Sequence, residues 1–424
     1  MMNALTGAPW LSAMARIFDN AGAELYIVGG AVRNPLMNLP LSDVDVCGPA
    51  RPEDVCALCE GTEIRAHLRA AHFGTVELHL TDENGKHQMA EYTTWREDSY
   101  RCGHKPESVK FTTDIAVDSV RRDFSVNALY RRVHPGCLED VIDPTGGLEH
   151  LKQGVLHTVT PDPDRVLGDD GLRILRAARF QAELDLLPTP ELLQSLTKNA
   201  HLLGDIACER LRDELQKVMM ADLRYPALKR RFPATFSGLS TIWRIGAWPY
   251  LFGDIPYDEE AAAALRGLAS PALSARMALL MRRADPARVG ECMQRMRFSA
   301  RETAASQRCV TAVQTVACAP LFSLVGLGRD ALETALCIFR ALGDEAGVRA
   351  AQHVLDRLRG KPMTLRELAL SGNDLKPVFE KQNRPLREMG AVLDGLWRSV
   401  VEQDYPNERC ALLHHPILGG ESNQ

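Results

Sequence analysis

Hydrophobic and polar positions follow two different patterns in the two parts of this 424-residue chain. Up to about residue 150, short apolar runs end at glycines and polar turns, and several of them alternate with polar residues, as strands do. After residue 150, such runs are few and apolar positions recur at helical spacing. The pattern predicts an α+β protein, with a small mixed sheet in an N-terminal head and an all-helical remainder.

A chain of 424 residues is too long for one compact core. We expect four parts, because the strand pattern ends near residue 150 and Pro and Gly interrupt the helical patterns that follow. These parts are the head (1–150), a helical neck (151–225), a helical body (226–345) and a helical tail (346–424).

Residues 25–47, LYIVGGAVRNPLMNLPLSDVDVC, predict a strand, a glycine turn, a short helix and a second strand. Asp43 and Asp45 lie two apart in the second strand, so they project from one face and can share a divalent cation. A D-x-D pair alone is more often a solvated strand end, and its interpretation depends on its surroundings.

The turn after the first strand carries Gly29 and Gly30. Because glycine has no Cβ, a phosphate could approach the backbone here and meet the amides of the following helix and the side chain of Arg33. A glycine pair is often only a turn. A phosphate site beside a cation site nevertheless favours nucleotidyl transfer.

A second hairpin is predicted from strands at residues 72–78 and 89–94, joined by the turn TDENG. Glu91 in the second strand is a candidate third carboxylate for the cation site, and the alternative is a solvent-facing strand residue. The polar stretch 96–111 has no clear period, so we expect a loop there.

Residues 120–129, VRRDFSVNAL, predict a helix anchored by its apolar side chains. The guanidinium of Arg122 suits a phosphate because it can donate two hydrogen bonds at once. Asp123 and Asn127, four apart on one helical face, can address ribose hydroxyls. The alternative for an RRD string is an ion cluster on the surface.

A further helix is predicted over residues 164–180, DRVLGDDGLRILRAARF. Asp169 and Asp170 precede three arginines, Arg173, Arg176 and Arg179, which are spaced three apart and share one broad face. The alternative is a capped helix whose arginines are solvated.

Residues 209–215, ERLRDEL, predict a polar helix that braces the neck. Arg210 with Glu214, and Asp213 with Lys217, are spaced four apart and are expected to form ion pairs along one helix.

Composition restricts the class of protein further. The net charge of −5 gives no overall attraction for nucleic acid, so RNA contacts must come from local basic patches. Eleven cysteines without a paired framework indicate a reducing compartment, and we expect a cytoplasmic protein. No run of about eighteen apolar residues occurs, so no membrane association is expected.

These strings occur in the order of the motifs of class II tRNA nucleotidyltransferases (CCA-adding enzymes) and related bacterial poly(A) polymerases, which the chain resembles. The matches are GG-x-V-R with D-x-D, RRDF-[ST]-x-NA, E-D-x-x-R-x-x-R-x-x-RF and ER-[IL]-x-x-EL. Three departures stand out: Asn34 replaces the usual Asp after Arg33, Asp169 replaces Glu, and Gly171 replaces Pro. The chain contains no His-Asp dipeptide, so no HD phosphohydrolase domain is expected.

The resemblance implies an enzyme that adds CMP and AMP from CTP and ATP to the tRNA 3′ end without a nucleic-acid template, releasing pyrophosphate. It implies that Asp43 and Asp45 hold Mg²⁺, that Asp170 and Arg173 read the base, and that the tail helps to bind the tRNA. The nucleotide-binding residues it implies are Gly30, Arg33, Arg122, Asp123, Asn127, Asp170, Arg173, Arg176 and Arg179.

Several alternatives stay open at this point. A poly(A) polymerase of the same family is the first, although residues 72–76, HFGTV, resemble the FGT strand of the tRNA enzymes more closely. Partial enzymes that add only CC or only A are a second group, and a non-catalytic helical RNA-binding protein is a third. The sequence does not decide the oligomeric state.

Overall fold

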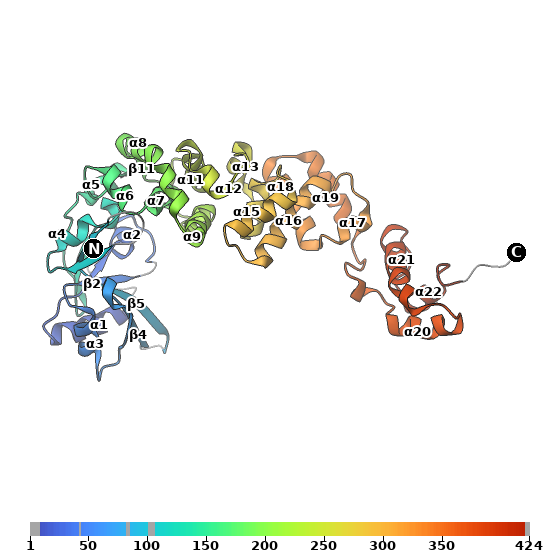
Figure 1. The fold of residues 1–424 in the computed structure, drawn as a ribbon, viewed down its shortest axis with the longest axis horizontal. Helices are drawn as coiled ribbons and strands as arrows, with labels where there is room; N and C mark the ends of the chain where they lie inside the picture. Colours follow the sequence, from blue (N-terminus) through green and yellow to red (C-terminus); the bar gives the residue numbers. More distant parts are fainter. Residues whose placement is uncertain (1–8, 42–43, 82–84, 101–106, 420–424) are drawn as a thin grey trace. The chain divides into compact units, whose positions relative to one another are not determined.

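The computed structural model describes residues 9–41, 44–81, 85–100 and 107–419 of the chain. The chain divides into two compact units, Met1–Gly253 and Asp254–Gln424. The first unit contains the sheet and the helices that follow it, and the second is helical (Figure 1). The predicted α+β class is therefore confirmed, whereas the finer division into four parts stays a prediction. No described helix is long and apolar enough to cross a membrane.

The sheet of the first unit has seven strands in the order β3-β4-β5-β2-β1-β8-β9. Only β2 and β5 run parallel, and the other neighbours are antiparallel, so the sheet is mixed as predicted. Its strands are β1 (Tyr26–Val28), β2 (Asp45–Gly48), β3 (Arg65–Ala70), β4 (Thr75–Thr81), β5 (His87–Thr94), β8 (Tyr130–His134) and β9 (Cys137–Leu138).

One face of this sheet is covered by helices α1 (Pro9–Asn20) and α3 (Pro52–Cys59). Met14 and Phe18 of α1 pack there against Val76, Leu78 and Tyr92 of β4 and β5, and all five are fully buried. Successive strand residues point to opposite faces. The residues that alternate with this core therefore lie on the other face, which we call the open face because its residues on β3, β4 and β5 reach solvent. Along β1, β2 and β8 the same face carries a second buried cluster, which includes Cys47 and Tyr130.

The predicted strand, glycine turn, helix and strand are confirmed as β1, α2 (Gly30–Leu36) and β2. Gly29 forms the turn with a φ of 65°, a conformation that favours glycine. A Cβ at this position would lie 3.0 Å from Oδ1 of Asn127, so the glycine also allows the Asn127 side chain to approach the backbone closely. The predicted hairpin is confirmed as β4 and β5.

Two local predictions are wrong. The stretch 96–111 contains the paired strands β6 (Arg96–Ser99) and β7 (Ser108–Phe111). Hydrophobic period could not reveal β6, because its inward positions carry Arg96 and Asp98, which form an ion pair at 2.9 Å. The helix predicted over 120–129 is also absent there: α4 (Ile115–Val120) ends first, and only a single 3₁₀ turn covers Ser125–Asn127.

The remaining helices of the first unit lie in the second half of its sequence. A short parallel pair, β10 (Val155–Leu156) and β11 (Leu187–Pro188), lies among them. The helices are α5 (Gly147–Gln153), α6 (Pro163–Asp169), α7 (Leu172–Leu184), α8 (Pro190–Asn199), α9 (Cys208–Met219), α10 (Ala221–Arg224), α11 (Ala234–Arg244) and α12 (Trp248–Phe252).

The second unit holds a separate apolar cluster near its C-terminal end, centred on Leu375, Phe379 and Leu396, which are fully buried. Its helices are α13 (Glu259–Ala264), α14 (Leu273–Leu280), α15 (Pro286–Arg295), α16 (Ala300–Thr315), α17 (Leu321–Val325), α18 (Arg329–Leu342), α19 (Glu345–Arg357), α20 (Gly372–Lys381), α21 (Met389–Glu402) and α22 (Arg409–Leu413).

Candidate active site

Carboxylates gather on the open face where β2 and β5 run side by side. Asp45, the first residue of β2, is the Cα partner of Glu91, and Glu91 is in turn the partner of Glu77 on β4. Asp45 and Glu91 are both exposed, while Val46 and Tyr92 turn into the core. Asp43 lies outside the described residues, so its predicted place beside Asp45 stays a prediction.

The chemistry of this edge fits a hard divalent cation. Desolvation raises the pKa of Glu91, and the carboxylates of Asp45 and Glu77 raise it further. A cation between such groups would relieve their repulsion, and Mg²⁺ prefers carboxylate oxygens. Within the described part of the chain, no group of three or more His, Cys, Asp or Glu side chains is arranged to hold a metal ion. Asp45 and Glu91 are only two carboxylates, so the assignment of a cation to this edge stays a prediction.

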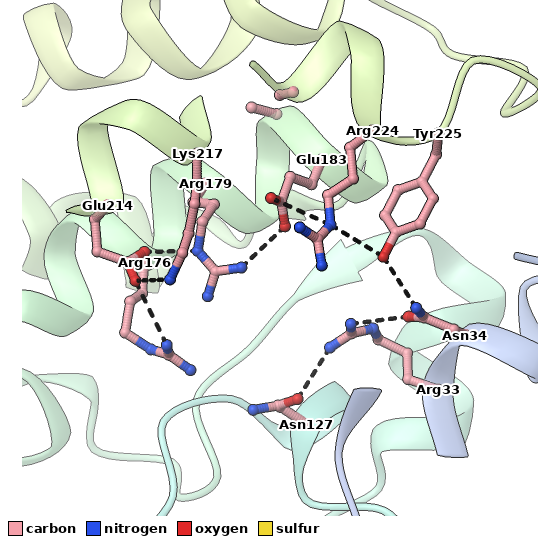
Figure 2. A network of polar contacts seen from close by, with 12 residues as sticks. Arg33, Asn34, Asn127, Arg176, Arg179, Glu183, Glu214, Lys217, Arg224 and Tyr225 are labelled. Atoms are coloured by element: carbon pink, nitrogen blue, oxygen red, sulfur yellow. Dashed lines mark hydrogen bonds and ion pairs between the residues drawn. The ribbon is translucent and has the colours of Figure 1, made fainter. Parts of the chain in front are cut away.

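Arg33 is a buried cation in helix α2, with 6% of its surface exposed. Its Nη1 donates to Oδ1 of Asn127 and its Nη2 to Oδ1 of Asn34, each at 2.9 Å (Figure 2). Its Nε has no hydrogen-bond partner in the described structure, and no described carboxylate lies within ion-pair distance. Burial, followed by the nearby guanidinium of Arg179, lowers the pKa of Arg33 to about 10.

Asn34 links Arg33 to a residue far along the chain. Its Nδ2 donates to the hydroxyl of Tyr225 at 3.0 Å (Figure 2). The same Nδ2 also donates to the carbonyl of Pro40 at 3.2 Å. An aspartate at this position would accept from Arg33 but could not donate to Tyr225. The amide therefore gives Arg33 a hydrogen bond without neutralising its charge.

Asp123 and Asn127 are in contact, although the predicted helix that would bring them together is absent. Oδ1 of Asp123 accepts from the backbone N–H of Phe124 at 2.8 Å and from Nδ2 of Asn127 at 3.4 Å. The first of these bonds competes with helix formation, as aspartate side chains commonly do. Oδ2 of Asp123 pairs with Arg176 at 2.5 Å, so a continuous polar chain runs from Arg176 to Arg33.

Arg122 has strong partners within the protein. Its Nη2 pairs with Oδ2 of Asp118 at 3.0 Å, and its Nε donates to the hydroxyl of Tyr130 at 2.7 Å. Burial opposes its charge, but Tyr130 and Asp118 outweigh burial and raise the pKa of Arg122. The proximity of Arg122 to a phosphate thus stays a prediction.

The arginines of helix α7 are neither solvated nor alike. Arg176 and Arg179 lie over the ring of Phe180, as Arg33 does, with guanidinium-to-centroid distances of 5.6, 4.6 and 5.1 Å. Arg179 pairs with Glu214 of α9 at 2.6 Å and with Glu183 at 2.9 Å (Figure 2). The solvated alternative for these two side chains is therefore wrong.

The side chains of Asp170 and Arg173 each have partners elsewhere in the protein. Oδ2 of Asp170 accepts from Arg210 of α9 at 2.7 Å, and Oδ1 accepts from the N–H of Leu172 at 3.1 Å. Arg173 is buried and donates from Nη1 to the carbonyl of Val166 at 2.9 Å. Its nearest carboxylate partner is Asp169, at 3.8 Å.

The ion pairs predicted within helix α9 are wrong. Arg210 pairs with Asp170, and Asp213 pairs with Arg212 at 2.8 Å. Glu214 instead binds the arginines of α7 and accepts from Lys217 at 3.3 Å. Packing of α9 against α7 gives Glu214 a largely buried partner in Arg179, which outweighs the weak pairing along one helix.

The structure adds three residues that the sequence did not single out, Asp118, Glu183 and Tyr225, and it gives Glu214 a partner other than the predicted one. The spacing of Asp118, four residues before Arg122, could have indicated its ion pair. Tyr225 lies 191 residues from Asn34, and no local signal could have indicated their contact.

Comparisons with known proteins agree with this arrangement. A family model described as Poly A polymerase head domain matches residues 25–157, and one described as probable RNA and SrmB-binding site of polymerase A matches residues 185–230. CCA-adding enzymes of Limosilactobacillus fermentum and Lactiplantibacillus plantarum are each 30% identical to the chain. The first match covers 93% of both chains, and the second covers 95% of this chain and 94% of its relative.

Solved structures show the same fold. The crystal structure of the Bacillus stearothermophilus CCA-adding enzyme in complex with CTP is 27% identical, with a TM-score of 0.72 and 95% of each chain covered. The Thermotoga maritima CCA-adding enzyme complexed with tRNA, at 18% identity and a TM-score of 0.64, shares the fold. The relatives match across nearly their whole length, and the chain therefore belongs to the CCA-adding enzyme family of nucleotidyltransferases.

Proposed function

We propose that this protein adds CMP and AMP to the 3′ end of tRNA, using CTP and ATP and no nucleic-acid template. The observation that carries the proposal is the match to CCA-adding enzymes over 93% of both chains. In each step the 3′-hydroxyl oxygen of the RNA would bond to the α-phosphorus of the nucleotide, and the bond to pyrophosphate would break. We place this reaction in the cytoplasm, in line with the ten described cysteines, which are all free thiols.

The acidic edge of the open face is the proposed place of reaction. Asp45, with Asp43 and with Glu91 beside it, would hold Mg²⁺. Bound there, the cation would supply charge neutralisation for the triphosphate and would activate the attacking hydroxyl. The role of Glu91 follows from its register with Asp45 and from the raised pKa of its carboxyl group.

We propose that Arg33 binds the triphosphate of the nucleotide, together with the backbone at Gly30. A buried guanidinium without a carboxylate partner among the described residues retains its full charge. An anion bound there would relieve the repulsion between Arg33 and Arg179, which lowers the pKa of Arg33. Arg122, Asp123, Asn127, Arg176 and Arg179 are proposed to shape the nucleotide site around it.

Base selection is proposed for Asp170 and Arg173. Cytosine and adenine each offer an amino donor beside a ring acceptor, whereas guanine and uracil place a carbonyl where the aspartate needs a donor. The ion pair with Arg210 fixes the direction of the Asp170 carboxylate. Because Arg173 has five N–H donors, those not bound to backbone carbonyls would serve the base.

The assay that tests this function uses purified protein and tRNA that lacks one, two or all three terminal nucleotides, with each labelled nucleotide triphosphate supplied alone. We expect CTP to extend tRNA lacking two or three nucleotides, and ATP to extend only tRNA that ends in CC. A poly(A) polymerase would instead extend all of them repeatedly with ATP. A partial enzyme would complete only the CC or only the A step.

The base-selection assignment has its own test. Asp170→Ala should slow incorporation of CTP and ATP and also relax discrimination against UTP and GTP, because a half-buried carboxylate no longer faces their carbonyls. A matched control is Asp213→Ala, which removes an exposed carboxylate from helix α9. If Asp170→Ala slows all four nucleotides by the same factor, the side chain only positions Arg210 and the N-terminus of α7.

A further inference from the structure

Three histidines from three neighbouring strands meet on the open face of the sheet: His67 of β3, His79 of β4 and His87 of β5. The ring centroids of His67 and His79 are 5.3 Å apart, and those of His79 and His87 are 5.2 Å apart. His67 and His87 are exposed, and His79 is half-buried between them. None of the three belongs to the motifs or contacts described above.

The side chains around the rings leave this surface open and mixed in charge. Arg69 pairs with Glu77 at 2.7 Å, and Nε2 of His79 lies 3.3 Å from the same carboxylate. Arg65 is exposed and is the Cα partner of His79. Met89, the partner of His79 on the other side, is 55% exposed. The outer two rings are open to solvent, and the described residues contain no group of three or more His, Cys, Asp or Glu side chains that could hold a metal ion.

The strand register places the histidines directly beside the acidic edge. Glu77, the Cα partner of Glu91, lies two residues from His79 along β4. His87 lies four residues from Glu91 along β5. At about 3.4 Å for each residue, His79 and His87 are roughly 7 and 14 Å from the level of Glu91. An RNA strand whose 3′ end reaches Glu91 and Asp45 could therefore lie across the rings.

We propose that His67, His79 and His87 form a binding surface for the single-stranded 3′ end of the RNA primer. The proposal rests on the proposed function, since the primer must reach the carboxylates on this face. Imidazole rings offer flat faces on which bases of any sequence can stack, and the guanidinium groups of Arg65 and Arg69 can donate to phosphates. Met89 adds an apolar contact between them. This combination suits a nucleic-acid strand better than an apolar protein segment.

The test is the steady-state addition of CMP to tRNA that lacks all three terminal nucleotides, at saturating CTP. A triple variant, His67→Ala with His79→Ala and His87→Ala, should raise the KM for tRNA about tenfold, as expected for the loss of base stacking. Its kcat and its KM for CTP should stay at the wild-type values. A His79→Phe/His87→Phe variant, which keeps two ring faces, should retain the wild-type KM for tRNA.

The matched control is His201→Gln, which changes an exposed histidine away from the sheet. An equal KM for tRNA in the triple variant and the control would overturn the proposal. So would a fall in kcat or in melting temperature at constant KM, because that result would indicate a structural role. If the wild-type protein adds no CMP to this tRNA, the proposed function itself fails, so the two failures can be told apart.

Discussion

The acidic edge of the sheet and the arginine-rich interior beside helix α7 differ in whether their charged side chains have partners of opposite charge. On the edge, Asp45 and Glu91 are exposed and lie side by side, and their mutual repulsion contributes to the raised pKa of Glu91. In the interior, Arg176 and Arg179 are matched by Asp123 and Glu214 at distances of 2.5 to 2.6 Å. A bound cation could relieve the repulsion between the carboxylates of the edge, whereas the charges of these two interior arginines are already paired.

Arg33 is an exception within the interior. It shares the ring of Phe180 with the paired arginines, yet its own hydrogen bonds go to the amides of Asn34 and Asn127. Neutralised pairs mainly stabilise and orient, and an uncompensated charge attracts a ligand. The difference predicts that substitutions on the edge and at Arg33 mainly affect activity, while those in the paired interior mainly affect stability.

The largest effect is expected at the acidic edge. Asp45→Ala should reduce CMP addition by about a thousandfold or more, since a carboxylate that binds the cation supports several kcal/mol of transition-state stabilisation. The melting temperature should stay close to that of the wild type, because Asp45 is exposed. The control is Glu97→Ala, an exposed carboxylate on β6, which should keep full activity. Activity within tenfold of the wild type in Asp45→Ala would remove the metal assignment.

The second effect concerns stability in the interior. Asp123→Ala should destabilise the protein by about 3 kcal/mol, because Arg176 loses the closer of its two carboxylate partners, in a mostly buried ion pair. The control Asp213→Ala breaks an exposed pair and should cost less than about 1 kcal/mol. Equal melting temperatures for the two variants would contradict the difference between paired interior and surface.

The same carboxylate predicts a pH dependence. Burial alone would raise the pKa of Asp123, but the guanidinium groups of Arg176 and Arg173 outweigh it and lower the pKa to about 2. The unfolded value is about 3.9. The stabilisation by Asp123 is therefore complete above that value and is lost as the pH falls from about 4 to 2. Thermal melts across this range should decline less steeply for Asp123→Asn than for the wild type.

Glu91→Gln combines a loss of activity with a small gain in stability. The raised pKa means that the charged carboxylate costs stability above its folded pKa, and this cost disappears below the unfolded value. The amide removes the cost, so the variant should melt slightly higher than the wild type at pH 7 and equally at pH 3. Nucleotide addition should fall by about tenfold to a hundredfold, because a neutral amide holds Mg²⁺ less well than a carboxylate does. A lower melting temperature at pH 7 would contradict the repulsion that we infer.

The sequence predicted local features correctly and missed those that depend on contacts between distant residues. The elements from β1 to β2 and the hairpin of β4 and β5 follow from local glycines and alternation, and the structure confirms them. The helix expected around Asp123 was wrong because a side chain took a backbone N–H. The partner of Asp170 was missed because Arg210 belongs to another helix, 40 residues away. Residue types along the chain therefore predicted the candidate site, while its ion pairs depended on tertiary packing.

The smallest expected effect is a change in KM that tests the role of Arg33. Asn34→Asp would place a carboxylate against this buried guanidinium, where it would compete with a bound triphosphate. The KM for CTP and the KM for ATP should both rise by about tenfold, the size of one charged hydrogen bond, because the contact does not distinguish bases. Tyr225→Phe, which removes one hydrogen bond of Asn34 and adds no charge, serves as the control and should leave both KM values unchanged. A rise for only one nucleotide would instead assign Arg33 to base recognition and end the contrast between a neutral interior and a single uncompensated charge.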